Sequence, residues 1–140
     1  MKILNYGVST LFLVCSFNFC FSQVTKFKTT STAMSTYNDY SNKWREFESV
    51  SGGSDILISI DLTNERVKIF SKREQILDII KYYDKKTDRD GDETIAFLCV
   101  DSDGLKCKVR YIILNSQEGR KQLYVGYSDV TYLYNIYRLE

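Results

Sequence analysis

The sequence predicts an all-β fold: a single antiparallel meander of about eight or nine short strands, arranged as a small barrel or a sandwich. Three observations lead to this prediction. Apolar and polar residues alternate through much of the chain, as they do in strands with one buried face. Clusters of Gly, Asn, Asp and Ser separate the alternating runs. The 140 residues contain no Pro, repeat or linker, so one domain is expected.

The first 22 residues have the three parts of a secretory signal peptide. Lys2 supplies the positive charge, residues 8–21 form an apolar segment, and Cys20-Phe21-Ser22 places small side chains at the cleavage site. A membrane anchor is the alternative, but the apolar segment is shorter than the ~20 residues of a spanning helix. A lipoprotein is a third possibility, but its signal needs a small residue directly before the cysteine, and neither Cys15 nor Cys20 follows one. We therefore expect a signal peptide at 1–22 and a single β domain at 23–140, secreted or periplasmic, with no membrane span after cleavage.

The expected strands follow one another along the domain. Weaker candidates are Val24 to Met34 and Lys43 to Val50. A clear alternation covers 56–62, and a second begins at Arg66 after the turn Thr63-Asn64-Glu65. Further strands are expected around 95–99, 105–113, 123–127 and 131–139. The alternation places Ile58, Ile60, Val67, Ile69, Phe97 and Val109 inside the fold, and Ser59, Lys68, Lys106 and Lys108 in solvent.

Residues 75–84 are open to two interpretations. Ser71-Lys72-Arg73-Glu74 matches a capping box, and the apolar residues that follow have helical spacing. The same segment is rich in Ile and Tyr, which favour strands. We expect a strand here, with a short helix as the alternative.

Two of the four cysteines lie opposite each other in a predicted hairpin. A three-residue loop Ser102-Asp103-Gly104, with Gly104 in the left-handed conformation, would pair Cys99 directly with Cys107. Opposed side chains of this kind are close enough for a disulfide, which an oxidising compartment favours. We expect that disulfide, with two buried free thiols as the alternative.

Charge and composition exclude several classes of function. The chain has 19 basic and 18 acidic residues and no His, so neither nucleic-acid binding nor imidazole chemistry is indicated. The acidic segment 84–93 resembles a calcium loop only superficially, because Lys86 and Phe97 would occupy its first and last ligand positions. We expect hairpin turns there, and no metal ion or cofactor.

Aromatic residues are the remaining candidates for function. A partly polar aromatic surface or barrel mouth could bind a small apolar ligand, a glycan or a protein. Alternatively, the tyrosines form a ladder between strands that only stabilises the sheet. The candidate ligand-binding residues are Trp44, Tyr124, Tyr127, Tyr132 and Tyr134.

The chain resembles small uncharacterised secreted proteins of Bacteroidetes bacteria and their phages. The resemblance covers nearly the whole domain, and it implies a compact β fold outside the cytoplasm without bringing an activity or a site. The matching residues are Phe27-Lys28-Thr29, Ala33-Met34, Trp44, 56–61, 66–72, 99–107, Gln122-Leu123-Tyr124-Val125 and Tyr134-Asn135-Ile136-Tyr137.

These observations predict a secreted, non-enzymatic binding or interaction module, with a sandwich or a small lipocalin-like barrel as its framework. The alternative is a secreted, glycosidase-like hydrolase that uses carboxylates alone. Its candidate residues are Asp61, Asp101, Asp103 and Asp129. Two of these carboxylates converging in a concave site would favour the hydrolase, and an aromatic or apolar site would favour the binding module.

Overall fold

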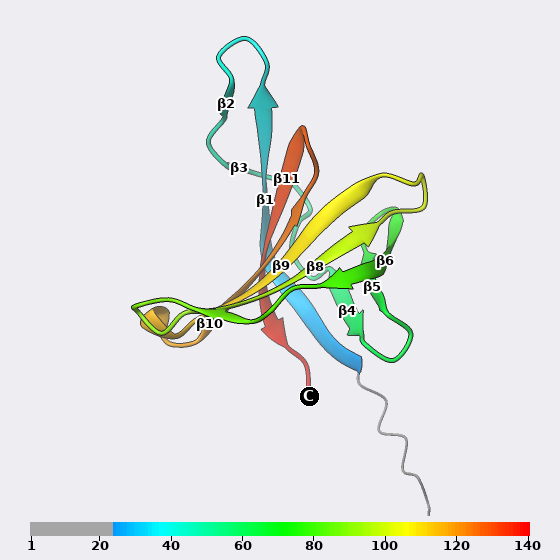
Figure 1. Cartoon of the computed structure of the whole chain (residues 1–140), viewed down its shortest axis with the longest axis vertical. Coiled ribbons are helices and arrows are strands. Elements are labelled where there is room, and N and C mark those ends of the chain that lie inside the picture. Colours follow the sequence, from blue (N-terminus) through cyan, green and yellow to red (C-terminus); the bar gives the residue numbers. More distant parts are fainter. Residues whose placement is uncertain (1–23) are drawn as a thin grey trace, which may run out of the picture.

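A computed structural model describes residues 24–140, so the predicted signal peptide lies outside the described part of the chain. Eight antiparallel strands form a closed barrel in which each strand pairs with the next along the chain (Figure 1). The last strand pairs back with the first, which confirms the meander and decides for a barrel over a sandwich. The barrel strands are β1 (Val24–Asn38), β4 (Leu57–Asp61), β5 (Arg66–Phe70), β6 (Glu74–Tyr82), β8 (Glu93–Val100), β9 (Lys106–Leu114), β10 (Arg120–Gly126) and β11 (Val130–Arg138).

Three short strands and one turn of 3-10 helix complete the fold. Strands β2 (Lys43–Trp44) and β3 (Glu48–Ser49) pair with β1, and β7 (Lys86–Thr87) pairs with β8. The 3-10 turn spans Asn115–Gln117. The expected strand from Lys43 to Val50 is therefore wrong as a single element, whereas β1 extends four residues beyond the expected Met34. The segment with two interpretations forms β6, so the expectation of a strand is confirmed.

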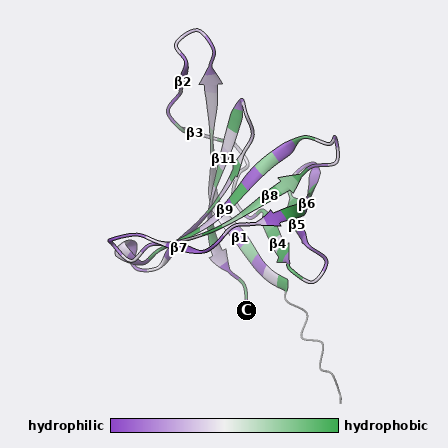
Figure 2. Cartoon of the chain, in the orientation of Figure 1, coloured by the Kyte–Doolittle hydropathy of each residue, from purple (hydrophilic) through white to green (hydrophobic). Residues whose placement is uncertain are grey.

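Side chains fill the interior of the barrel, as expected for eight strands. The six residues predicted to be buried are all between 0% and 7% exposed. They pack with Phe27, Leu77, Leu123 and Ile136 in one continuous core. Lys106 and Lys108 are exposed as predicted, whereas Ser59 and Lys68 are half-buried. Figure 2 shows the alternation as bands of hydrophobic and hydrophilic residues along β9.

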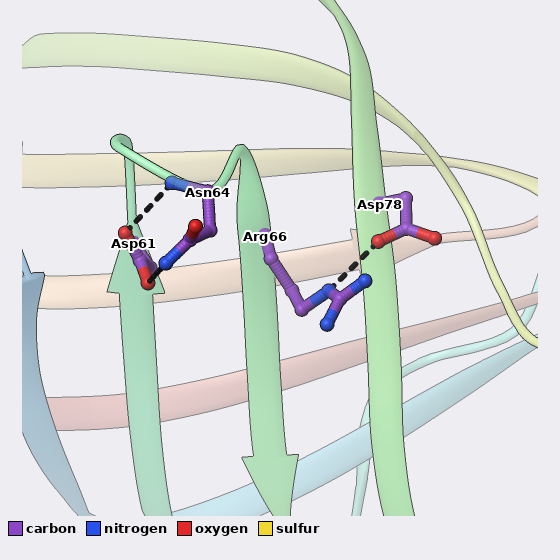
Figure 3. Close-up of polar contacts among 4 residues, drawn as sticks. All are labelled: Asp61, Asn64, Arg66 and Asp78. Atoms are coloured by element: carbon purple, nitrogen blue, oxygen red, sulfur yellow. Dashed lines mark hydrogen bonds and ion pairs between the residues drawn. The ribbon is translucent and has the colours of Figure 1, made fainter.

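The predicted turns form at the expected residues. Asp61 accepts hydrogen bonds from the backbone and side-chain nitrogens of Asn64, at 3.0 and 2.8 Å, and so closes the turn between β4 and β5 (Figure 3). In the next predicted hairpin, Gly104 has a φ of +81°, the left-handed conformation that its three-residue loop requires. A short polar side chain determines the first of these two turns, and a glycine the second.

The predicted pairing of Cys99 with Cys107 is confirmed, but the predicted disulfide is not formed, and both thiols are free and buried. Asp101 N donates to Leu105 O at 2.9 Å, which makes these two residues a hydrogen-bonded pair. Such pairs alternate with non-hydrogen-bonded pairs, so the cysteines, two residues further along, also form a hydrogen-bonded pair. Side chains stand further apart in such pairs, and the thiols pack as small apolar groups.

The two ends of the barrel differ in their loops. We call one end the mouth: it consists of loops 71–73, 101–105 and 127–129 and the long connection 39–56 between β1 and β4. The end of β1 and the short strand β2 project beyond the other strands here (Figure 1). The opposite end carries loops 62–65, 83–92 and 115–119 and both ends of the described chain. Among the described residues, no helix has the length and apolar character needed to cross a membrane.

Candidate ligand-binding site at the mouth of the barrel

Two clefts of similar size open at the mouth, with volumes of about 560 and 550 Å³. Both volumes lie within the usual range of ligand sites. The clefts share Arg73, Gln75 and Tyr132, which stand between them. The first cleft is also lined by Glu74, Leu77, Asp101, Asp103, Tyr127 and Asp129. The second is also lined by Thr32, Val50, Gly53, Ile56, Lys72 and Tyr134.

Two tyrosines with stacked rings lie where the two clefts meet: Tyr132 lines both clefts, and Tyr134 lines the second. The ring centroids of Tyr132 and Tyr134 are 6.4 Å apart, with 25° between the ring planes. Tyr134 is buried, and that burial raises the pKa of its hydroxyl to about 12, although a hydrogen bond with Gln75 opposes the shift. The Tyr134 hydroxyl therefore stays neutral, and its hydrogen bond fixes the position of the Gln75 side chain. Tyr132 is only partly buried, so its ring is accessible from the clefts.

Tyr127 and Asp101 join two loops of the first cleft. The Tyr127 hydroxyl donates to Asp101 Oδ2 at 3.0 Å, and Asp101 Oδ1 accepts from the backbone N–H groups of Asp103 and Leu105 at 2.9 Å each. Desolvation would raise the pKa of Asp101, but hydrogen bonds from Leu105, Tyr127 and Asp103 outweigh it and lower that pKa. The Asp101 carboxylate is therefore a charged acceptor that fixes the loop.

Buried hydroxyl groups fix the wall of the second cleft. Thr29 and Thr32 both donate their hydroxyl protons to Gly53 O, at 2.8 and 2.7 Å, and Thr29 Oγ1 also accepts from Ile56 N at 2.9 Å. A Cβ atom on Gly53 would lie 2.5 Å from Thr32 Cβ, so only glycine fits at this close approach. The position of the connection 50–56 thus depends on two side chains of β1.

The structure brings three of the five predicted ligand-binding residues to the mouth: Tyr127, Tyr132 and Tyr134. The other two lie elsewhere. Trp44 is on the projecting hairpin, with its ring 5.5 Å from that of Tyr37, and Tyr124 is on the outside of the barrel.

Of the predicted carboxylates, Asp101, Asp103 and Asp129 line the first cleft, whereas Asp61 belongs to a turn at the opposite end. Sequence reasoning missed Arg73, Gln75 and Gly53. The sequence pattern could have identified Gln75. It lies near the start of a strand and alternates in step with Leu77 and Ile79, so its side chain is on the inward face. An inward polar residue at that place indicates a barrel mouth.

The acidic segment 84–93 forms the expected turn. Oxygen atoms of Asp88, Asp90 and Asp92 lie within 4.8 Å of one another. However, Asp88 Oδ1 accepts from the backbone N–H groups of Asp90 and Asp92, and Asp92 accepts hydrogen bonds from Ser116. These local hydrogen bonds account for the cluster.

No protein family model, curated protein or solved structure matches this chain. The geometry of the mouth therefore carries the functional argument, and the resemblance to secreted Bacteroidetes proteins stays a prediction.

Proposed function

We propose that this protein is a secreted or periplasmic binding module that holds a glycan at the mouth of its barrel. The observation that carries the proposal is the pair of clefts that share Tyr132, Gln75 and Arg73. The signal peptide predicted at 1–22 supports the location.

The lining of the mouth suits a polar, ring-shaped ligand. Tyr132 offers an apolar ring on which the C–H face of a sugar can pack, with a polar hydroxyl at its edge. Arg73 and Gln75 supply hydrogen-bond donors, and Asp103 and Asp129 supply acceptors. Sugar hydroxyls both donate and accept, so this mixture of groups would satisfy several of them at once.

A purely apolar ligand fits less well. It would need space inside the barrel, and the interior below the mouth is filled by Ile69, Leu77, Leu123 and Phe27, each at most 1% exposed. The clefts themselves carry charged residues of both signs. Burying an apolar molecule against these charges would remove water from them without supplying new partners.

One observation favours the alternative, a carboxylate-only hydrolase: Asp101, Asp103 and Asp129 line one cleft. A glycosidase, however, needs one carboxyl group that stays protonated at the working pH. The pKa of Asp101 is shifted in the opposite direction, and its oxygens accept hydrogen bonds from its own loop and from Tyr127. We therefore propose binding in preference to hydrolysis.

The test is a titration of the protein with a panel of neutral, amino and uronic oligosaccharides, followed by NMR and calorimetry. Tyr132→Ala should weaken binding about tenfold or more, which corresponds to about 1.4 kcal/mol. The matched control is Tyr137→Ala, because Tyr137 lies on the same strand but is 44% exposed and far from the mouth. Failure of every oligosaccharide to bind, or equal effects of the two variants, would overturn the proposal. Release of new reducing ends in the same samples would favour the hydrolase instead.

A further inference from the structure

Basic and acidic residues are distributed unevenly over the wall of the barrel, although the whole chain has nearly equal numbers of both. Four strands that are neighbours in the sheet, β9, β10, β11 and β1, contain no Asp or Glu. The same strands carry eight basic residues: Lys26, Lys28, Lys106, Lys108, Arg110, Arg120, Lys121 and Arg138. Most acidic residues of the described chain lie in the loops at the two ends instead.

The remaining barrel strands differ from this basic half. Strand β4 carries an acidic residue, β5 carries basic residues and β6 carries both kinds. Arg66 Nε lies 2.9 Å from Asp78 Oδ1 in an ion pair between β5 and β6 (Figure 3). Within residues 24–140, the other ion pair joins Lys85 to Glu93. The basic residues of β9 therefore have no carboxylate within ion-pair distance.

Aromatic rings contact basic side chains at the β9 border of this basic half and on the nearby strand β6. The Nζ atoms of Lys81 and Lys108 lie 5.0 and 4.9 Å from the centroid of the Tyr83 ring. The Arg110 guanidinium lies 4.7 Å from the centroid of Tyr124. We call Lys81, Tyr83, Lys108, Arg110 and Tyr124 the basic stripe. Because cation–π contacts leave the positive charge uncompensated, the stripe retains its attraction for anions.

The register of the sheet shows that the stripe crosses several strands. Lys81 on β6 pairs with Leu98 on β8, which pairs with Lys108 on β9. Arg110, two residues further on the same face, pairs with Tyr124 on β10. Adjacent strands are about 4.8 Å apart, and alternate residues of a strand about 7 Å apart. Lys81 and Lys108 therefore lie in one row across the strands, and Arg110 is the next outward residue along β9, so the three cations form a group on an open wall.

We propose that the basic stripe binds a linear anionic polysaccharide, one that carries carboxylate or sulfate groups at regular intervals. An extended polymer can contact cations that are spread over several strands of a convex wall better than a compact ligand can. Single-stranded nucleic acid is disfavoured because its bases need free aromatic faces for stacking. The rings of the stripe already contact cations. This surface is distinct from the mouth, and the proposal stands independently of the glycan site there.

The experiment measures binding of the full chain to heparin and to polygalacturonate at several salt concentrations. Neutral dextran and single-stranded oligo(dT) are compared in parallel. We expect at least one of the two polyanions to bind, with an affinity that falls as salt rises. The triple variant K81Q/K108Q/R110Q should lose about tenfold or more of that affinity. The single variant K108Q should lose less affinity for the polyanion, and it tests the same prediction if the triple variant folds poorly.

The matched control, K43Q/K68Q/R89Q, removes the same charge at three positions outside the stripe, on β2, on β5 and in loop 83–92, and should bind almost as well as the original protein. The proposal is overturned if neither polyanion binds, if both triple variants lose affinity equally, or if oligo(dT) binds more tightly than the polysaccharides. Tyr132→Ala should leave polyanion binding unchanged, so failure at the mouth and failure at the stripe can be distinguished.

Discussion

Thr29 and Thr32 provide a comparison in which two similar substitutions should have different costs. Both hydroxyl groups donate to Gly53 O, but only Thr29 Oγ1 also accepts from Ile56 N. Thr29→Val would leave that N–H without its acceptor in a partly buried place, which costs about 1–3 kcal/mol. Thr32→Val would leave Gly53 O with its other donor, so the cost should be about 1 kcal/mol or less.

Urea unfolding of the two variants and of the double variant measures these costs. The double variant should lose more than the sum of the single variants, because Gly53 O then has neither of its donors, and residues that share a partner are not additive. Equal m-values would show that the denatured states are comparable. The reasoning is refuted if Thr32→Val costs as much as Thr29→Val, or if the double variant is additive.

Further predictions concern the core, the thiols and the cleft wall. Phe97→Ala should lower the free energy of unfolding by about 3–5 kcal/mol, whereas Lys108→Ala should change it by no more than about 0.5 kcal/mol; a larger loss for Lys108 would contradict the register. Because burial raises the pKa of Cys99 to about 12 and that of Cys107 to about 11, iodoacetamide at pH 8 should modify neither in the native protein and both after unfolding, as peptide mass spectrometry would show. Gly53→Ala should weaken ligand binding at the mouth, measured by calorimetry, because the new Cβ displaces the connection; unchanged affinity would contradict this.

The barrel strands were largely predictable because they alternate. Ile58 and Ile69 on neighbouring strands are both fully buried, as the period of two requires. Closure into a barrel was not predictable in the same way. It depends on β1 pairing with β11 across the whole domain, and local alternation is the same in a barrel and a sandwich. The expected strand from Lys43 to Val50 is divided into β2 and β3, because hydrogen bonds with β1 determine these two short strands and their own sequence pattern does not.

The candidate site was predictable only in part. Tyr132 and Tyr134 share a face two residues apart, but which face points inward depends on the whole barrel. β1 also carries an irregularity between Thr29 and Ser31, which changes the alternation on that strand. Gly53 and Arg73 lie in connections between strands, where the sequence has no alternation from which the direction of a side chain could be predicted. The cysteine pairing was predicted correctly, whereas both thiols are free.

The pairing of β1 with β11 also has consequences for how the chain folds. Thr30 donates its hydroxyl proton to Asn135 O at 3.3 Å across a separation of 105 residues. The pairing of these two strands, which we call the seam, closes the wall of the barrel. The loop entropy of joining such distant segments must be lost before the seam forms, so folding should be slow for a domain of this size. Until then the two strands are unpaired edges that can pair with other chains. Aggregation during refolding should therefore depend on protein concentration, and a soluble peptide with the sequence of β11 should compete for β1 during folding but not afterwards.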